Sequence, residues 1–235
     1  MLDPGRGRTK TGRLWVYARD DRPWCGPDPP AALYLYSPDR KAERPASHLE
    51  RFKGVLQVDG YAGFEKLTGN GDIALAACWA HTRRQFYEVH QATGSPIAEE
   101  ALRRIGALYA IESSIRGFTA EERLGRRRAQ TLPLINDLEP WLERELHRVP
   151  PRSGLAEAIR YALSRWTALC RFLDDGRIAL DTNTVERAIR PIALGRKNHL
   201  FAGSDGGAQR FLDGAPSPFA GERAADRNPA ALVVS

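Results

Sequence analysis

The chain has 235 residues, of which 42% are hydrophobic and 27% are charged. This balance is typical of a globular protein with a substantial core and argues against a chain that is disordered throughout. Lysine and arginine (35) outnumber aspartate and glutamate (29), and the net charge is +6. Such a charge is compatible with a polyanionic partner such as DNA but does not require one.

The cysteines and the apolar segments bear on where the protein works. Cys25, Cys78 and Cys170 have no spacing typical of a disulfide framework, so we expect reduced thiols. The opening segment, MLDPGRGRTKTGRLW, has no apolar targeting region, and nowhere do about 18 apolar residues follow one another. We therefore expect a soluble, cytoplasmic protein with no membrane partner.

The first part of the chain predicts a sheet. Alternating β-forming residues over 13–21 and 31–39 indicate two strands, and the turn-rich segment between them favours an antiparallel hairpin. The elements expected next are a short helix over 48–54, a strand over 55–59, a helical turn over 62–71, a buried strand over 72–81 and a helix over 82–92.

After residue 95 the apolar residues recur at helical spacing, and no strand is predicted. We expect helices over 96–116, from a capping box at Thr119 and Glu122, over 141–149, from a cap at Ser153 to about residue 176, and around Glu186. Pro133 and Pro140 are expected to interrupt the helices. The chain thus predicts a mixed α/β fold with a helical insertion. Four tryptophans are expected in the core: Trp15, Trp79, Trp141 and Trp166.

Two carboxylates stand out as candidate functional groups. Asp59 ends the strand over 55–59, and Glu186 lies in the first turn of a predicted helix. Acids delivered by two rigid elements suit divalent-metal phosphoryl chemistry, because Mg²⁺ prefers oxygen ligands. Each residue also has a simpler interpretation: Asp59 in an Asp-Gly turn, and Glu186 in a capping box with Asn183. Spacing alone does not decide between these interpretations.

Four long segments, in this order, resemble the catalytic region of bacterial insertion-sequence transposases of the IS-sixty-six group. They are TGRLWVYARDDRP, SPDRKAERPASHLERFKGVLQVDGYAGFEKL, CWAHTRRQF and LDTNTVERAIRPIALGRKNHLFAGSDGGA. The resemblance covers roughly residues 2–208. It implies a ribonuclease-H-like enzyme of the Asp-Asp-Glu type, in which Asp59 matches the second acid and Glu186 the glutamate. Both residues would then be catalytic and would bind Mg²⁺ or Mn²⁺.

The same resemblance implies a division of the chain. Residues 1–95 would form the N-terminal part of the catalytic domain, 96–179 a helical insertion, and 180–205 the catalytic helix and its following loop. The family's first acid, and the central strand that carries it, would precede Met1, so we expect this strand to be missing. Residues 206–235 depart from the family pattern and predict a disordered tail, for which we consider a shifted reading frame near Ala208.

Several cations are candidates for DNA contact. Arg83 and Arg84 match the family's CWAHxRR run, and four more basic residues lie on or after the Glu186 helix: Arg187, Arg190, Arg196 and Lys197. Each could instead form an ion pair or face solvent. Arg126, Arg127 and Arg128 are interpreted as a solvated helix face, with DNA contact as the alternative.

Cys78 and His81 have the spacing of a half zinc site, but no second pair matches it, so packing in a buried strand is the preferred interpretation. The leading functional hypothesis is a DNA transposase catalytic domain, truncated and of doubtful activity. Its expected partners are transposon ends and target DNA, together with a second copy of the chain (self-association) or an intact transposase. The alternatives are a non-catalytic remnant that binds DNA or assembles with intact transposase, and a ribonuclease-H-like nuclease of repair or resolution.

Overall fold

The computed structural model describes residues 12–69, 71–198 and 231–234. The chain divides into two compact units. The sheet unit comprises Met1–Asp21, Asp28–Leu75 and Thr182–Ser235, and the helical unit comprises Arg22–Pro27 and Ala76–Asp181. The helical unit thus begins at Ala76, earlier than the insertion expected from residue 96, because the helix over Trp79–Thr93 packs against the helices that follow it.

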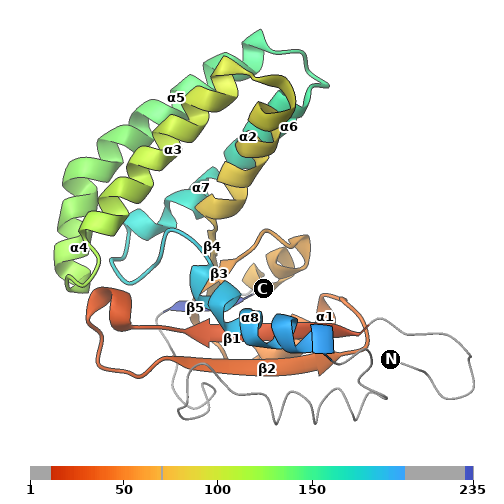
Figure 1. Cartoon of the computed structure of the whole chain (residues 1–235). Helices are drawn as coiled ribbons and strands as arrows, with labels where there is room; N and C mark the ends of the chain where they lie inside the picture. The colour runs from red at the N-terminus through yellow and green to blue at the C-terminus, as the bar shows by residue number, and fades with distance from the viewer. Residues whose placement is uncertain (1–11, 70, 199–230, 235) are drawn as a thin grey trace, which may run out of the picture. The chain divides into compact units, whose positions relative to one another are not determined.

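The sheet unit is built on five strands in the order β2-β1-β5-β3-β4 (Figure 1). Their bounds are Arg13–Arg19 (β1), Ala31–Ser37 (β2), Gly54–Val58 (β3), Ile73–Ala77 (β4) and Ala231–Val234 (β5). The predicted hairpin is confirmed, since β1 and β2 pair antiparallel from Arg13↔Ser37 to Arg19↔Ala31. The mixed α/β class is confirmed as well.

The central strand comes from the far end of the chain. β5 pairs antiparallel with β1, through Tyr17↔Val234 and Ala18↔Val233, and parallel with β3, from Val55↔Ala231 to Val58↔Val234. The expected disordered tail is therefore wrong for these four residues; their apolar sequence, Ala-Leu-Val-Val, suits a strand buried within a sheet. The remainder of that tail, residues 206–230 and 235, lies outside the described residues.

Strand alternation gives the sheet two buried faces. On one face Trp15, Tyr17, Leu56 and Val58 form a cluster with Phe64 from the 3₁₀ helix η2 (Ala62–Thr68). On the opposite face Val16 and Ala18 of β1 contact Val185 and Ala188 of helix α8 (Asn183–Asn198). Successive residues of a strand point to opposite faces, so β1 contributes to both clusters.

The helix expected over 48–54 is wrong in position. Helix α1 runs earlier, over Glu43–His48, and its chain ends in a turn at Leu49, which is buried. Pro45 lies within the first turn of α1, where a missing N–H costs nothing because the first-turn N–H groups have no helical acceptor.

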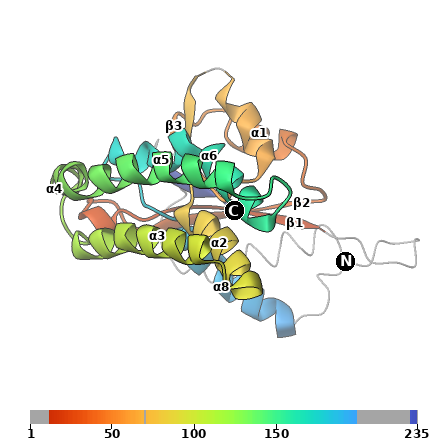
Figure 2. The ribbon, with the colours of Figure 1, turned by 90° about the horizontal axis from the view of Figure 1, so that it is seen from above.

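The helical unit consists of packed helices with short connections. Helices α2 (Trp79–Thr93), α3, α5 and α6 contact one another in the pairs α2–α3, α2–α6, α3–α5 and α5–α6 (Figure 2). The other bounds are α3 Pro96–Ser114, α4 Ala120–Arg126, a π-helical turn Arg127–Thr131, α5 Leu132–Arg148, α6 Gly154–Leu163, α7 Trp166–Cys170, and the 3₁₀ turns Arg22–Trp24 and Arg171–Leu173. No helix in the described ranges combines the length and apolar character that crossing a membrane requires.

The predicted helix starts are confirmed at two caps. The Thr119 hydroxyl accepts from the Glu122 N–H at 3.3 Å, and the Thr119 N–H donates to the Glu122 carboxylate at 2.9 Å, which completes the capping box. The Ser153 hydroxyl accepts from Ala156 N–H at 3.1 Å. The four tryptophans expected in the core are all buried.

Two helices have other bounds than expected. Pro140 lies inside α5 and does not interrupt it; Asn136, whose carbonyl loses its helical donor to this proline, is exposed and can be solvated. The long helix expected after Ser153 ends at Leu163, and α7 starts separately at Trp166.

Candidate functional site

Asp59 directly follows β3, at the C-terminal end of this interior strand. Its Oδ1 accepts a hydrogen bond from the Tyr61 N–H at 3.2 Å, and Gly60 has a φ of 95°, a conformation that favours glycine. The Asp-Gly turn is therefore present. The side chain is nevertheless partly exposed, so holding the turn leaves room for another role.

Glu186 is exposed in the first turn of α8. The N–H groups of Val185 and Glu186 both donate to the Thr182 carbonyl, at 3.0 and 3.2 Å, so Thr182 is the residue that caps the start of α8. Asn183 already lies inside α8, and the expected capping box between Asn183 and Glu186 is therefore wrong. Burial of the neighbouring Val185 fixes the helix on the sheet and leaves Glu186 at its flank.

Both acids belong to the sheet unit, and the elements that carry them both adjoin β5. β5 pairs with β3, whose end carries Asp59, and α8, which carries Glu186, contacts β1 and β5. Leu56 and Val58 belong to the face opposite α8, and Asp59 lies in the bend that directly follows β3. Because β1, β5 and β3 are neighbours, β1 and β3 lie two strand spacings, about 10 Å, apart.

Two polar contacts hold α8 on the sheet. The Tyr34 hydroxyl of β2 donates to the Ala188 carbonyl at 2.9 Å, and burial raises the pKa of Tyr34, which keeps this donor protonated. At the start of the helix, the Arg187 guanidinium lies 3.7 Å from the carboxylate of Asp20, whose side chain is only 2% exposed. These contacts, which the sequence did not suggest, limit the freedom of the segment that carries Glu186.

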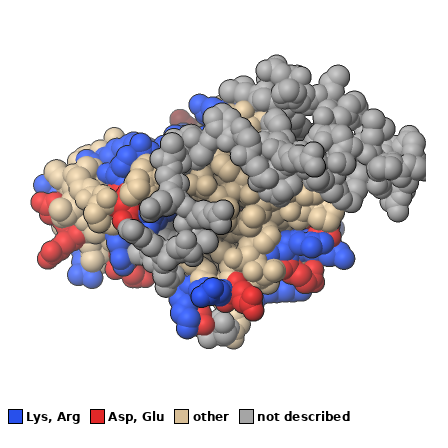
Figure 3. All heavy atoms as spheres, turned by 90° about the horizontal axis from the view of Figure 1, so that it is seen from below, with Lys and Arg blue, Asp and Glu red and all other residues tan. Residues whose placement is uncertain are grey.

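The cations proposed for DNA contact are distributed over both units. Arg83 and Arg84 are exposed on α2 of the helical unit, whereas Arg187 and Arg190 are exposed on α8 of the sheet unit. Arg187 is engaged with Asp20, and no ion pair joins Arg190 to Glu186 among the described side chains. The side chains of Arg196 and Lys197 lie outside the described residues. On the face drawn in Figure 3, basic and acidic side chains lie beside one another rather than in separate areas.

The described residues contain no group of three or more His, Cys, Asp and Glu side chains placed to hold a metal ion. Asp59 and Glu186 are two oxygen donors, a set that Mg²⁺ uses together with waters and substrate phosphates. Cys78 is buried, in agreement with the packing interpretation of that segment.

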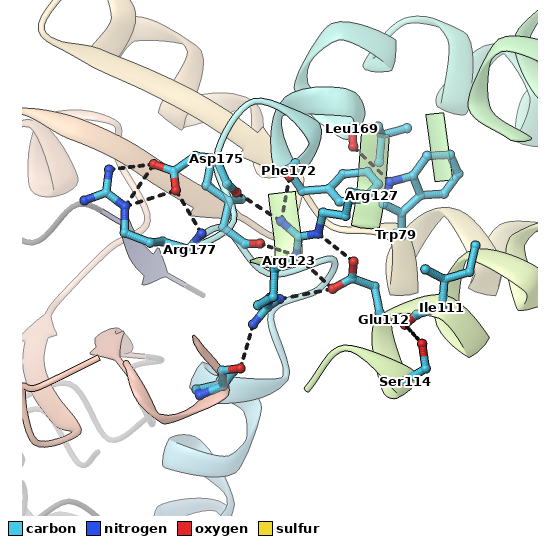
Figure 4. Close-up of polar contacts among 12 residues, drawn as sticks. Trp79, Ile111, Glu112, Ser114, Arg123, Arg127, Leu169, Phe172, Asp175 and Arg177 are labelled. Carbon is cyan, nitrogen blue, oxygen red and sulfur yellow. Dashed lines mark hydrogen bonds and ion pairs between the residues drawn. The ribbon is translucent and has the colours of Figure 1, made fainter. Parts of the chain in front are cut away.

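Arg127 has a role that the sequence interpretation missed. Its guanidinium is fully buried, so the expectation of a solvated face at 126–128 is wrong at this position. It binds Glu112 in two places, at 2.6 and 2.8 Å, and donates to the carbonyls of Phe172, Asp175 and Ile178 at 2.6 to 3.0 Å (Figure 4). These contacts engage all five N–H donors of the guanidinium. Arg127 therefore fixes the turn after α7 to the helices α3 and α4.

A second arginine shares the same carboxylate. Arg123 donates to Glu112 at 3.1 Å and to the Pro23 carbonyl at 2.9 Å. Burial, with the positive charge of Arg127 beside it, lowers the pKa of Arg123 to about 10. The cluster of Glu112, Arg123 and Arg127 thus organises the helical unit rather than binding DNA.

The sequence model described as "Transposase IS66 family" matches residues 1–210. Three uncharacterized proteins of Sinorhizobium fredii are similar: y4qI is 46% identical over 217 residues (89% of this chain, 40% of y4qI), y4jD 44% over 216 (89% and 42%) and y4hP 43% over 221 (87% and 40%). The chain thus spans about two fifths of the length of these relatives, and no solved structure matches it. Because the family model covers most of the chain, the protein belongs to the IS66 family of transposases.

Proposed function

We propose that this chain carries the catalytic region of a DNA transposase, which cleaves and joins DNA strands with the help of divalent metal ions. Asp59 and Glu186 are the proposed catalytic residues and metal ligands. The observation that carries the proposal is that the strand ending at Asp59 pairs with β5, and the helix bearing Glu186 contacts that same strand. Membership of a transposase family supports DNA as the substrate.

The layout of the sheet supports a ribonuclease-H-like fold. In that fold the first strand is central and is flanked by the second and the fourth. Here β5 has a central position, antiparallel to β1 and parallel to β3, and a helix that follows the helical unit covers one face. β5 thus has the pairing that the first strand has in that fold, although it comes from the far end of this chain.

The proposed chemistry needs a metal site that is open to DNA. Bound Mg²⁺ or Mn²⁺ would supply an activated water or 3′ hydroxyl and would neutralise charge on the phosphate. Asp59 is partly exposed and is oriented by the Tyr61 N–H, while Glu186 is exposed on a helix that Tyr34 anchors. Both residues thus lie on anchored segments and are at least partly exposed, which suits ligands shared with a large substrate.

The proposed cations would contribute to DNA binding through contacts with the phosphate backbone of the DNA. Arg190 is exposed four residues after Glu186 and is the best placed of the proposed contacts. Arg187 would have to leave Asp20 or share its guanidinium, and Arg83, Arg84, Arg196 and Lys197 are proposed from the family resemblance. Each phosphate contact should steepen the plot of log binding constant against log salt concentration, for duplex DNA, by a slope of about 0.9.

The experiment that tests the proposal is a strand-cleavage assay on DNA from the ends of the element, with Mg²⁺ or Mn²⁺. Asp59→Asn and Glu186→Gln should each abolish cleavage, because each removes a charged ligand. Glu65→Gln, which changes an exposed acid on η2, is the matched control and should retain activity. Cleavage that persists in either of the first two variants would contradict the assignment.

A second function has its own support. The four residues of β5 are all apolar, and the described residues contain no group of three or more His, Cys, Asp and Glu side chains placed to hold a metal ion. A chain with two acids instead of three could bind DNA, or assemble with a complete transposase, without cutting. Salt-dependent DNA binding that survives in the Asp59→Asn, Glu186→Gln double variant, without any cleavage by the native chain, would favour this function.

A further inference from the structure

Arg40 is an exposed arginine whose guanidinium lies over an aromatic ring. It belongs to the sheet unit, in the connection between β2 and α1, and its guanidinium carbon lies 4.2 Å from the centroid of the Tyr61 ring. The Tyr61 hydroxyl also donates a hydrogen bond to the Arg40 carbonyl, so the same ring binds the backbone of this residue. These two contacts give the guanidinium a defined position, although it is exposed to solvent.

The Tyr61 ring is itself held in place by its surroundings. It packs against the rings of Trp15 and Phe64, which are buried, with ring centroids 6.0 and 5.4 Å apart. A Cβ atom at Gly63 would overlap the Tyr61 ring, so glycine at this position leaves the room that the ring occupies. The ring is therefore a fixed platform that rests on the core of the sheet unit and supports Arg40.

The positive charge of Arg40 is not neutralised by the acid that precedes it. Asp39 instead binds the Nε and Nη2 groups of Arg44, both at 3.1 Å, and accepts from the Lys41 N–H at 3.2 Å. No carboxylate among the described side chains forms an ion pair with Arg40. A guanidinium that stacks through its face keeps the N–H donors in its plane available, and their geometry matches a phosphate.

Tyr61 also links Arg40 to the proposed metal ligand. The Tyr61 N–H donates to Asp59 Oδ1 at 3.2 Å, and the two residues between these positions span at most about 7 Å of chain. One strand of duplex DNA carries a phosphate about every 3.4 Å along the helix axis. When one phosphate engages a metal ion at Asp59, a phosphate a few nucleotides away on the same strand can therefore reach Arg40.

We propose that Arg40, supported by the Tyr61 ring, binds a backbone phosphate of the DNA strand that is processed at Asp59. The inference rests on the proposed function, which supplies DNA as the substrate, and it adds a residue outside the basic groups already proposed. Because the contact is with the backbone, it fixes the position of the strand and carries no base preference.

The first arm of the test measures binding of a DNA duplex from the ends of the element to the full-length protein, without divalent ions so that no strand is cut. Arg40→Gln should weaken binding about tenfold, and should reduce the slope of log binding constant against log salt concentration by about 0.9. Lys41→Gln is the matched control, since it removes the same charge from the next residue, which is also exposed. No aromatic ring among the described residues supports Lys41, and its substitution should cause less than half of that loss on a logarithmic scale.

The second arm separates a phosphate contact from packing on Tyr61. Arg40→Lys keeps the charge but lacks the planar fork, so it should keep the native salt slope and bind with an affinity between those of the native chain and Arg40→Gln. A role limited to packing would instead lower the thermal midpoint of Arg40→Gln and leave its salt slope native. In the cleavage assay, Arg40→Gln should raise KM and leave kcat unchanged, because the contact is made before and during the reaction alike.

The outcomes distinguish this contact from the proposed catalysis. Native affinity and salt slope in Arg40→Gln, or equal losses in Arg40→Gln and Lys41→Gln, would overturn the contact and leave the catalysis standing. A native chain that binds the duplex but never cuts it would remove the catalysis, while the dependence of binding on Arg40 would still support the contact.

Discussion

At the scale of single residues, the buried Arg127 illustrates how a charge can organise a helical unit. Its five donors are all engaged, two of them with Glu112. Arg127→Met should lower the free energy of unfolding by about 3–5 kcal/mol, because it leaves a buried carboxylate with only Arg123 as its partner. Chemical denaturation of the variant measures this loss.

The neighbouring Arg128 is exposed and gives a matched control, since Arg128→Met should change stability by less than about 0.5 kcal/mol. The double variant Arg127→Met, Glu112→Gln should recover part of the loss, because the uncompensated charge is gone. Equal effects of Arg127→Met and Arg128→Met would show that the buried pair does not exist in solution.

His48 should make the sheet unit sensitive to acid. Its Nδ1 lies 2.9 Å from the Tyr17 hydroxyl, and burial, with a smaller contribution from Arg44, lowers the pKa of His48 below its usual 6.5. The unfolded chain therefore binds a proton at a higher pH than the folded one, so the stability that the neutral ring contributes is present above about pH 6.5 and is lost as the pH falls through the lowered pKa.

Thermal unfolding of the native chain and of His48→Gln, measured at about pH 7.5 and pH 5.5, checks this prediction. The midpoint of the native chain should fall more steeply with acid than that of His48→Gln. The exposed His147 provides the control, and His147→Gln should keep the native pH dependence. Identical slopes for all three proteins would contradict the role of His48.

The burial of Arg127 was predictable from the spacing of residues in the sequence, although the run of three arginines suggested a solvated face. Arg123, Arg127 and Thr131 follow one another at steps of four, and the series continues into the apolar positions Ile135 and Leu138. This spacing predicts that all of them lie on one helix face. By contrast, nothing in the sequence indicated the partners of Arg127, because Glu112 and the carbonyls after α7 approach it only through tertiary packing.

At the scale of elements, the caps show where local sequence determines structure. The capping box at Thr119 and Glu122 was predictable because both partners lie within one turn. Thr119→Ala should lower the free energy of unfolding by about 1 kcal/mol, through the loss of the bond to the Glu122 N–H. Denaturant titration monitored by circular dichroism provides the measurement.

Thr167 lies exposed in α7 and serves as the comparison, since Thr167→Ala removes the same atoms from a position without a cap. Its effect should be within about 0.5 kcal/mol of zero. If the two substitutions had equal effects, the bond between Thr119 and Glu122 would make no measurable contribution.

β1, β2 and β3 were predicted well because their residues alternate or form short apolar runs. β5 was not predicted, since four residues give too short a pattern and its partners lie far away in the sequence. Pro140 does not break α5, because the Asn136 carbonyl that loses its donor is on an exposed side of the helix. The sequence does not show this exposure, which depends on how the helix packs.

At the scale of the whole molecule, sequence patterns separated a sheet-forming part from a helical part, but the unit boundaries follow contacts. Residues 22–27, from the loop between β1 and β2, belong to the helical unit. The Pro23 carbonyl accepts hydrogen bonds from the Gly117 N–H, at 3.0 Å, and from Arg123. Such long-range bonds have no local signature in the sequence.

The candidate site consists of Asp59 and Glu186, and the local sequence around each of them also had a simpler structural interpretation. The turn at Asp59 is present, while the capping box at Glu186 is not. What joins the two residues is the sheet, since β3 pairs with β5 and α8 contacts β5. Sequence could propose this pair only through a resemblance, because the strand between them comes from the far end of the chain.

Binding of Mn²⁺ by the full-length protein, followed by electron paramagnetic resonance, tests most directly whether Asp59 and Glu186 hold metal together. Asp59→Asn and Glu186→Gln should each weaken binding at least about tenfold, equivalent to 1.4 kcal/mol, and the double variant should lose little more than either alone. Glu65→Gln should bind as the native chain does. Native-like Mn²⁺ binding in either single variant would contradict a site shared by the two carboxylates.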